Sequence, residues 1–250
     1  RRPCRLLPKG VNFVMCQVIY KGERNCKMLQ DGEHGVILQR DRETYAVAPH
    51  IPCGIVSPET LRKIADVAAK YSAPALKLTS AARIAIVGLK EEDVEKVWAD
   101  LGMDQGAATG LCVRSIKACP GTTFCRRGMQ DSLGVGMKLD EKYHGLELPS
   151  KFKIGVSGCP NQCAETCIKE IGLVGMPKGW KVLAGGNGGS KPRLSQEIAA
   201  DMTTDEAFAL IERIIEQYKK QAKRGQRLGA MIEEMGLEEF KAMVLTEQVL

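Results

Sequence analysis

Four cysteines in two pairs constrain the fold of this chain more than any other feature. Five residues separate Cys119 from Cys125, three separate Cys159 from Cys163, and about thirty-three lie between the pairs. Each pair sits in a segment that contains proline or glycine, CPGTTFC and CPNQC, which is typical of turns. If the four thiols act together, the fold must bring two turns that are distant in sequence to one place.

Three chemistries are compatible with such a set of thiols. Four thiolates from two loops suit a 4Fe–4S cluster, which proteins hold with four cysteines. Zinc ribbons usually place about two to four residues between paired cysteines, so the gap between Cys119 and Cys125 suits zinc less well. Buried structural thiols are the third interpretation. The spacing favours the cluster and leaves the other two open.

The remaining cysteines fit no ligand pattern. Ten cysteines in 250 residues are too few for a disulfide scaffold, and clustered cysteines in a reducing cytosol more often serve metal or redox chemistry. Cys167 follows Cys163 by four residues, which predicts that both lie on one face of a helix. We expect Cys167 to be a small packing residue rather than a fifth ligand. The others without an assigned role are Cys4, Cys16, Cys26, Cys53 and Cys112.

Composition and charge exclude several function classes. The net charge of +6 is mild; it suits an acidic protein partner or an anionic substrate and is too diffuse to indicate nucleic acid. No apolar run approaches the roughly eighteen residues that a membrane span needs. No secretory signal is visible, and the sequence begins Arg1-Arg2-Pro3 without a methionine. We therefore expect a cytoplasmic protein without a membrane segment.

Residues 34–105 have the pattern of a small α+β unit. The apolar periodicity predicts, in order, two strands, a helix, two strands and a helix. Ser57 followed by Pro58 is a typical helix start, and Gly102 is a typical helix end. This order implies a small sheet with helices on one face. The expected elements span 35–39, 44–49, 57–71, 75–80, 82–89 and 91–102.

Residues 106–200 and 201–250 complete the expected α+β organisation. The first of these parts opens with a stretch rich in glycine, threonine and cysteine that has no long periodic run, and the second is helical throughout. Residues 1–33 lack clear periodicity and form an N-terminal extension of unknown role. The expected elements are a helix at 128–143, strands at 151–158, 171–175 and 180–186, a glycine-rich loop at 185–189, and helices at 203–224, 226–235 and 237–244.

Cationic side chains cluster around the cysteines. Lys151 and Lys153 occupy alternate positions of one expected strand, so both point to the same face, and that strand leads into the second cysteine pair. Arg114 precedes Cys119 by five residues. Cations gathered beside a cluster predict a pocket for an anion. The alternative is that they are ordinary surface charges.

The segment RSIKACPGTTFC, followed by LPSKFKIGVSGCPNQCAETCIKEIGLVG, resembles the sirohaem-containing nitrite and sulfite reductases. The resemblance covers roughly residues 35–245, and the length and order of the motifs are most similar to the small, single-module assimilatory-type sulfite reductases. It implies an α+β fold in which a small ferredoxin-like sheet-and-helix unit precedes a sirohaem- and 4Fe–4S-binding domain and C-terminal helices.

The resemblance also implies roles for single residues. The four paired cysteines would bind the 4Fe–4S cluster, and Cys163 would share its thiolate with the sirohaem iron. Arg114, Lys151 and Lys153 would hold the substrate anion. The residues implied with less direct matches are Arg83, in place of the family's usual arginine in LTSAAR, and Gly186 and Asn187, near the sirohaem carboxylates.

The implied activity is the six-electron reduction of sulfite to sulfide. The first alternative is that the protein reduces nitrite to ammonia at the same site. The second alternative is that it is a cluster-carrying electron-transfer subunit of a larger complex. The implied donor is a ferredoxin-like protein. Larger family members contain two copies of this module, so a homodimer is expected to replace the missing copy.

Overall fold

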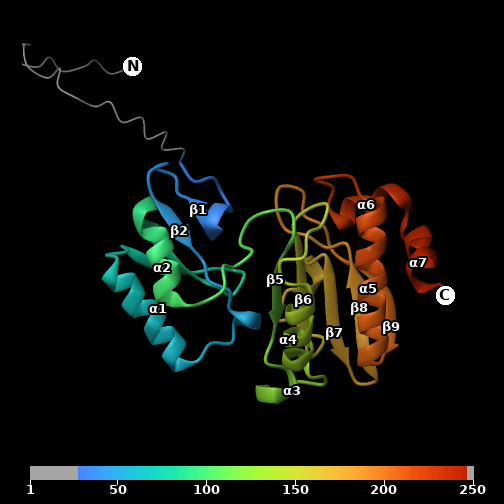
Figure 1. Ribbon diagram of the computed structural model, residues 1–250. Coiled ribbons are helices and arrows are strands. Elements are labelled where there is room, and N and C mark those ends of the chain that lie inside the picture. The colour runs from blue at the N-terminus through green and yellow to red at the C-terminus, as the bar shows by residue number, and fades with distance from the viewer. Residues whose placement is uncertain (1–27, 247–250) are drawn as a thin grey trace, which may run out of the picture.

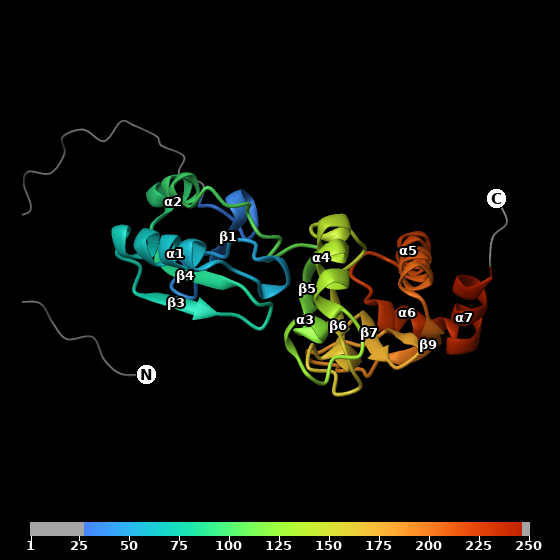
Figure 2. The same cartoon turned by 90° about the horizontal axis from the view of Figure 1, so that it is seen from below.

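Two β-sheets organise residues 28–246, the part of the chain that this computed structural model describes (Figure 1). The first sheet belongs to the N-terminal part and the second to the C-terminal part, and the two lie side by side in both views (Figures 1 and 2). Most of the expected extension, with Cys4, Cys16 and Cys26, lies outside the described residues. Within 28–246, no helix is long and apolar enough to span a bilayer.

The N-terminal sheet has four antiparallel strands in the order β1-β2-β4-β3. Helices α1 and α2 pack on one face of it, as the sequence predicts (Figure 2). Ser57 caps α1 by accepting a hydrogen bond from the Thr60 amide, and Gly102 ends α2 in the left-handed conformation. The bounds are β1 Val36–Leu38, β2 Tyr45–Val47, α1 Pro58–Lys70, β3 Ala75–Leu78, β4 Ile84–Leu89 and α2 Val94–Leu101.

The C-terminal sheet has five strands in the order β5-β6-β7-β8-β9. The pairs β5–β6 and β6–β7 are parallel, whereas β7–β8 and β8–β9 are antiparallel. The strands are β5 Val113–Ala118, β6 Phe152–Ser157, β7 Ile171–Met176, β8 Gly179–Ala184 and β9 Gln196–Met202. The helices are α3 Gly121–Phe124, α4 Ser132–Tyr143, α5 Thr204–Gln221, α6 Leu228–Met235 and α7 Leu237–Leu245.

Short 3₁₀ turns complete the described elements. They are η1 Glu33–Gly35, η2 Pro52–Gly54, η3 Glu91–Asp93 and η4 Thr166–Ile168. The turn η2 brings Cys53 from the N-terminal part against β5 and α4, where its thiol is buried in the core of the C-terminal part. Cys53 is therefore a packing contact between the two parts of the chain.

Each sheet has its own hydrophobic core. Ile64, Ile86 and Leu101 are fully buried between the four-stranded sheet and its helices. The larger core lies on the five-stranded sheet, where Tyr218 and Phe240 from the C-terminal helices are buried together with strand residues. The C-terminal helices thus share one core with the cysteine-bearing strands, because their apolar faces close over the same sheet.

One expectation about local structure was wrong, and one strand was not predicted. Cys163 and Cys167 do not share a helix, because Gln162 and Glu165 have positive φ angles of 51° and 57° and the segment is a series of turns that ends in η4. The strand that was not predicted is β9. Its residues are mostly exposed and only Ile198 is buried, so it lacks a continuous apolar signal.

Candidate functional site

The two cysteine pairs follow the carboxyl ends of neighbouring parallel strands. Cys119 comes directly after β5, and Cys159 comes two residues after the end of β6. Carboxyl ends of parallel strands lie at the same edge of a sheet, where α/β proteins commonly bind ligands. The fold therefore brings together the two turns that the sequence separates.

Glycines allow the two cysteine turns to touch. A Cβ atom on Gly158 would lie 2.7 Å from the Cα of Gly121 on the other turn. The Gly158 carbonyl accepts hydrogen bonds from the amides of Met129 at 2.7 Å and Gln130 at 3.1 Å. The backbones are in contact here, so no larger residue fits at this junction.

The chemistry of the donor set fits an iron–sulfur cluster. All four cysteines are free thiols, and the Gly158 amide donates to the Cys119 sulfur at 3.1 Å, a contact of the kind that tunes cluster sulfurs. Cys159 is buried, whereas Cys163 is exposed and open to a neighbouring group. Between residues 28 and 246, no three His, Cys, Asp or Glu side chains are arranged to hold a single metal ion. Thiolates that each bind a different iron stand further apart than ligands of one ion.

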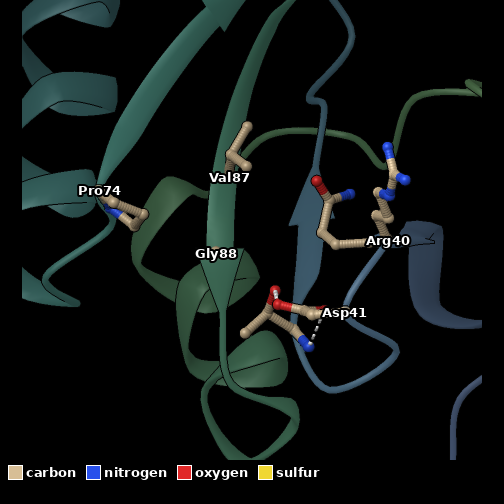
Figure 3. A pocket seen from close by; sticks show the side chains of 7 residues that line it. Arg40, Asp41, Pro74, Val87 and Gly88 are labelled. Carbon is tan, nitrogen blue, oxygen red and sulfur yellow. Dashed lines mark hydrogen bonds between the residues drawn. The ribbon is translucent and has the colours of Figure 1, made fainter. Parts of the chain in front are cut away.

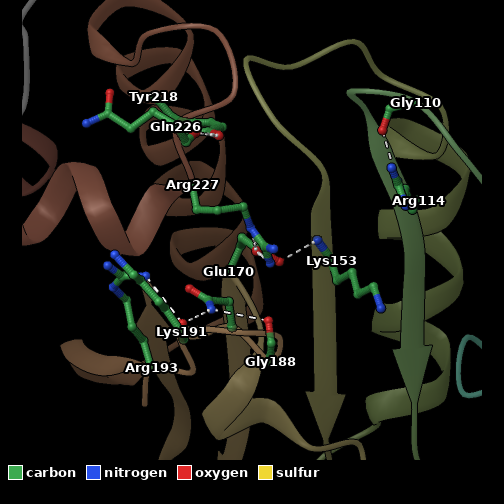
Figure 4. A network of polar contacts seen from close by, with 11 residues as sticks. Gly110, Arg114, Lys153, Glu170, Gly188, Lys191, Arg193, Tyr218, Gln226 and Arg227 are labelled. Carbon is green, nitrogen blue, oxygen red and sulfur yellow. Dashed lines mark hydrogen bonds and ion pairs between the residues drawn. The ribbon is translucent and has the colours of Figure 1, made fainter.

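A cavity of about 440 Å³ lies next to the segment that follows Cys163, and half of its lining residues are cations; Figure 4 shows Arg114, Lys153 and Arg227 among them. Its lining side chains come from β5, from the start of β6, from the turn after Cys163 and from the residue that precedes α6. Ser80 reaches it from the N-terminal part, so the cavity lies where the two parts of the chain meet. The lining residues are Ser80, Arg114, Lys151, Lys153, Glu165, Ile168, Lys169, Gly188, Gly189 and Arg227.

Arg114 enters the cavity from an irregularity in β5. Val113 pairs with Phe152 and Ser115 pairs with Lys153, so Arg114 is the extra residue of a β-bulge. A bulge re-aims one side chain away from the regular pleat. The Arg114 Nε atom donates to the Gly110 carbonyl at 2.9 Å, which fixes the near end of the guanidinium (Figure 4).

Lys153 is held at its backbone by a buried ion pair. Its amide donates to the Glu170 carboxylate at 2.8 Å, and the same carboxylate accepts from Arg227 Nε at 2.7 Å (Figure 4). Glu170 is fully buried. Burial lowers the pKa of Lys153, and neighbouring Lys169 lowers it further. Lys153 is therefore a cation that releases a proton more readily than an ordinary lysine.

A second carboxylate lies on the cavity wall between two lysines. Glu165 accepts from Lys117 and from Lys169, each at 2.9 Å. These two hydrogen bonds lower the pKa of Glu165 to about 2, so it stays ionised at any ordinary pH. Both Lys169 and Arg227 thus have carboxylate partners of their own.

The remaining cations give the cavity its net charge. Among the described residues, Arg114, Lys151 and Lys153 form no ion pair with a carboxylate. Their charges are available to an anion, and a partly enclosed setting strengthens that attraction relative to bulk water. The cavity can therefore bind a small anion next to the segment that follows the second cysteine pair.

Sequence reasoning missed Lys169 and Arg227. Lys169 lies in the sequence CAETCIKE, close to the second cysteine pair, and its position offered a signal. Arg227 lies before a C-terminal helix, and nothing in its sequence context points to the cysteines. Only the folded chain brings it to Glu170.

Besides the four cysteines, three predicted site residues do not line the cavity. Arg83 is 4% exposed, and its guanidinium donates to the backbone carbonyl of Arg114 from behind the strand. Asn187 is buried, and its side-chain amide donates to the Lys191 carbonyl at 2.8 Å within its own loop (Figure 4). Gly186 packs against the backbone of the turn after the cysteines. The next two glycines, Gly188 and Gly189, line the cavity instead.

A larger depression of about 710 Å³ lies on the four-stranded sheet, away from the cysteines (Figure 3). Its one carboxylate, Asp41, caps its own turn by accepting hydrogen bonds from the amides of Glu43 and Thr44, each at 3.0 Å. Those hydrogen bonds lower the pKa of Asp41. The lining offers no convergent set of polar groups, so we place the functional site in the cationic cavity.

Two family models match the chain, one for each sheet. The model for the nitrite/sulfite reductase ferredoxin-like half domain matches residues 37–103. The model for the nitrite and sulphite reductase 4Fe-4S domain matches residues 109–249 and includes both cysteine pairs. The chain belongs to the nitrite and sulfite reductase family. It is therefore an oxidoreductase, and membership implies the two expected cofactors, a 4Fe–4S cluster and sirohaem.

Relatives of this family differ greatly in length. The chain is 43% identical over 217 residues to an assimilatory-type sulfite reductase of Nitratidesulfovibrio vulgaris, covering 87% of this chain and 100% of that protein. It is 38% identical over 225 residues to a nitrite reductase [NAD(P)H] of Bacillus subtilis, covering 90% of this chain but 28% of that protein.

Solved structures share the same fold. A dissimilatory sulfite reductase I has a TM-score of 0.74 at 16% identity, with 82% of this chain and 70% of that chain covered. The NirA protein of Mycobacterium tuberculosis has a TM-score of 0.70 at 19% identity, with 82% and 40% covered. These likenesses establish the α+β architecture that the sequence predicts.

Proposed function

We propose that this protein is a sulfite reductase that reduces sulfite to sulfide by six electrons. The observation that carries the proposal is the cavity next to the segment that follows Cys163, in which Arg114, Lys151 and Lys153 have no carboxylate partner among the described residues. The Nitratidesulfovibrio sulfite reductase supports the choice of substrate, because this chain covers all of it.

The residues present would hold both cofactors. Cys119, Cys125 and Cys159 would bind the cluster together with Cys163, and the exposed Cys163 would also reach the sirohaem iron. When bound, the cluster would supply electrons singly, and sirohaem would supply the iron that takes the sulfur atom. The open glycines Gly188 and Gly189 leave room on the opposite wall of the cavity.

The cations of the cavity would handle the oxyanion and its protons. Arg114 and Lys151 would hold the sulfite oxygens, because their charges are not neutralised by carboxylates. Lys153 would donate protons as S–O bonds break, since burial makes its ammonium more acidic than usual. Arg227 and Glu170 would keep Lys153 in place through its backbone amide.

A visible absorption spectrum with iron and labile-sulfide analysis tests the cofactors. Tetrapyrrole absorbance together with about four irons beyond the sirohaem iron supports the proposal. Iron without tetrapyrrole would instead support a cluster-carrying electron-transfer subunit of a larger complex. In Cys163→Ser we expect turnover to be lost, and normal turnover would contradict the assignment of the shared thiolate.

Steady-state kinetics test the substrate and the cations. We expect kcat/KM for sulfite to exceed that for nitrite, and Lys153→Met to lower kcat for sulfite by about a hundredfold with cofactor content retained. Lys181→Met is the matched control, because Lys181 pairs with Glu197 on β8–β9 and does not line the cavity. A clear preference for nitrite would favour the second candidate, nitrite reduction, which the match to the Bacillus nitrite reductase supports.

An acidic, ferredoxin-like electron donor is the proposed protein partner. Phe124 is 76% exposed between two of the cluster cysteines, and the exposed Arg126 and Arg127 follow it. An aromatic anchor with adjacent arginines suits a transient interface with an acidic surface. Reduction rates with a ferredoxin should fall in Arg126→Glu/Arg127→Glu and stay unchanged with a small chemical reductant.

A homodimer is the proposed assembly. Strand β3 is an edge strand with every residue exposed, and Leu78 on it is 73% exposed. An exposed edge strand with apolar side chains can pair with the same strand of a second copy.

The cytoplasm is the proposed location, because the free thiols of the described cysteines are consistent with a reducing compartment.

A further inference from the structure

A buried polar cluster joins the two parts of the chain behind the cavity. In the N-terminal part, His50 follows β2 and Arg83 directly precedes β4. In the C-terminal part, Asp140 and His144 lie at the end of α4. The rings of His50 and His144 are stacked, with centroids 3.5 Å apart and planes at 13°. Two of the three histidines of the chain therefore meet at this junction.

Hydrogen-bonding roles in this cluster follow from chemistry. His50 Nε2 lies 2.6 Å from the Asp140 carboxylate, so that nitrogen carries a proton and donates it. Arg83 Nη2 lies 3.3 Å from His144 Nε2, and an arginine can only donate, so this imidazole nitrogen accepts. Burial lowers the pKa of His144 to about 4, which keeps it neutral and able to accept.

The cluster ends on a residue of the cavity. Arg83 Nη2 also donates to the backbone carbonyl of Arg114, which is the bulged residue of the edge strand β5. An edge strand has no neighbouring strand on its outer side. The Arg83 guanidinium therefore donates the hydrogen bond that a neighbouring strand would otherwise give at the bulge. Arg83 is 4% exposed and needs a counter-charge, and Asp140 supplies it by electrostatic attraction without direct contact.

The cluster has few alternative partners. Arg83 Nε, His50 Nδ1 and Asp140 Oδ1 are buried atoms without a hydrogen-bond partner among residues 28–246. Gly106 packs closely against Arg83, because a Cβ atom there would lie 3.2 Å from Arg83 Nε. Removal of His144 therefore leaves the Arg83 guanidinium with Asp140 Oδ1 and His50 Nδ1 as the free acceptors of the cluster, and neither belongs to β5.

We propose that Asp140, His50, His144 and Arg83 form a positioning bridge that sets the bulge of β5 and thereby aims Arg114 at the bound anion. The inference rests on the proposed function, since Arg114 acts there on the substrate. The four residues act through Arg114 and do not touch the anion themselves. This gives Arg83 a role that differs from direct contact with substrate.

His144→Leu and His144→Gln form the matched test, because glutamine retains an acceptor for Arg83 and leucine does not. In His144→Leu we expect KM for sulfite to rise about tenfold while kcat stays within about twofold, since substrate binding is weakened and the reacting groups are kept. His144→Gln should recover most of the loss. Lys142→Gln on the same helix is the control, because it breaks an exposed pair with Glu212 and a cation–π contact with Tyr143, neither of which involves the bridge.

Hydrogen exchange of the segment 111–118, followed by mass spectrometry, tests the bridge without turnover. The segment should exchange faster in His144→Leu and normally in Val97→Ala, a core truncation of α2 that lowers stability elsewhere. Because this readout needs no substrate, it separates failure of the bridge from failure of the proposed function. If nitrite proves to be the substrate, the same KM comparison is made with nitrite.

Two results would overturn the bridge. One is an unchanged KM with unchanged exchange in His144→Leu. The other is the same KM rise in Val97→Ala, which would mean that any loss of stability has this effect. If His144→Leu does not fold, Arg83→Lys serves in its place, because lysine keeps the charge but ends one bond short of Nη2, the atom that reaches both acceptors.

Discussion

The charge state of His144 links the stability of this protein to pH. Its pKa is lowered from 6.5 to about 4, first by burial and then by His50, with Asp140, Arg83 and Asp104 also facing it. Between these two pH values the unfolded chain binds a proton at this histidine and the folded chain does not. Stability therefore rises with pH in that window and is lost as the pH falls through it.

Urea denaturation between pH 4 and 6.5 checks this linkage. His144→Gln has no such proton, so its stability should fall less steeply on acidification than that of the wild type. Lys142→Gln should follow the wild-type curve. Equal slopes for His144→Gln and the wild type would mean that other groups dominate acid unfolding.

The buried pair of Arg227 and Glu170 makes a second prediction for single residues. Arg227→Met leaves the Glu170 carboxylate buried and uncompensated, which should cost about 3–5 kcal/mol in the free energy of unfolding. The double variant Glu170→Gln/Arg227→Met should regain much of this, because no buried charge remains. Arg193→Met, which breaks an exposed pair with Glu233, should cost about 0–1 kcal/mol. A double variant no more stable than Arg227→Met would contradict the electrostatic explanation.

Residues whose roles depend on their neighbours in sequence were predictable, and residues that depend on tertiary pairing were not. Lys151 and Lys153 were predicted to share a face, because strand alternation is a local rule, and both line the cavity. Arg227 was not predicted, because its partner Glu170 lies in a distant segment. Arg83 was predicted as a site residue, but the sequence could not show that its guanidinium faces a carbonyl behind Arg114.

Among the elements, the cysteine turns depend most strictly on glycine. Gly158→Ala would place a methyl group 2.7 Å from the Gly121 backbone and push the two turns apart. We expect the iron content of the purified protein to fall severalfold, since the four thiols must converge for the cluster to form. Gly236→Ala is the control, because it strains the backbone at a positive φ of 96° between α6 and α7 while its Cβ would meet no atom within 4 Å. Full iron content in Gly158→Ala would show that the turns tolerate separation.

Regular elements with a strong apolar period were predictable from sequence, and irregular ones were not. Helix α5 follows a clear period and buries Leu210, Ile211 and Ile214 on one face. Strand β5 contains a bulge, which interrupts the alternation that identifies strands, and β9 is mostly exposed. The misjudged helix after Cys163 failed because cysteine spacing alone does not reveal positive φ angles.

The exposed edge of β3 makes a prediction for the whole molecule. If two copies pair there, the wild type should have twice the 27.3 kDa mass of the chain in light scattering, and Leu78→Asp should reduce it to one chain. Leu194→Asp is the matched control, because Leu194 is similarly exposed but lies in the other part of the chain. A wild-type mass of one chain, or a Leu194→Asp monomer with a Leu78→Asp dimer, would contradict the pairing.

The three uncompensated cations of the cavity have a consequence for how the protein is handled. Arg114, Lys151 and Lys153 repel one another when no anion is present, and folding must hold them together against that repulsion. A small anion that binds only the folded chain relieves the repulsion and raises the melting temperature, with the logarithm of its concentration once that exceeds its Kd. Phosphate or sulfate in a storage buffer will therefore act as a stabiliser and as a competitor of substrate at the same time.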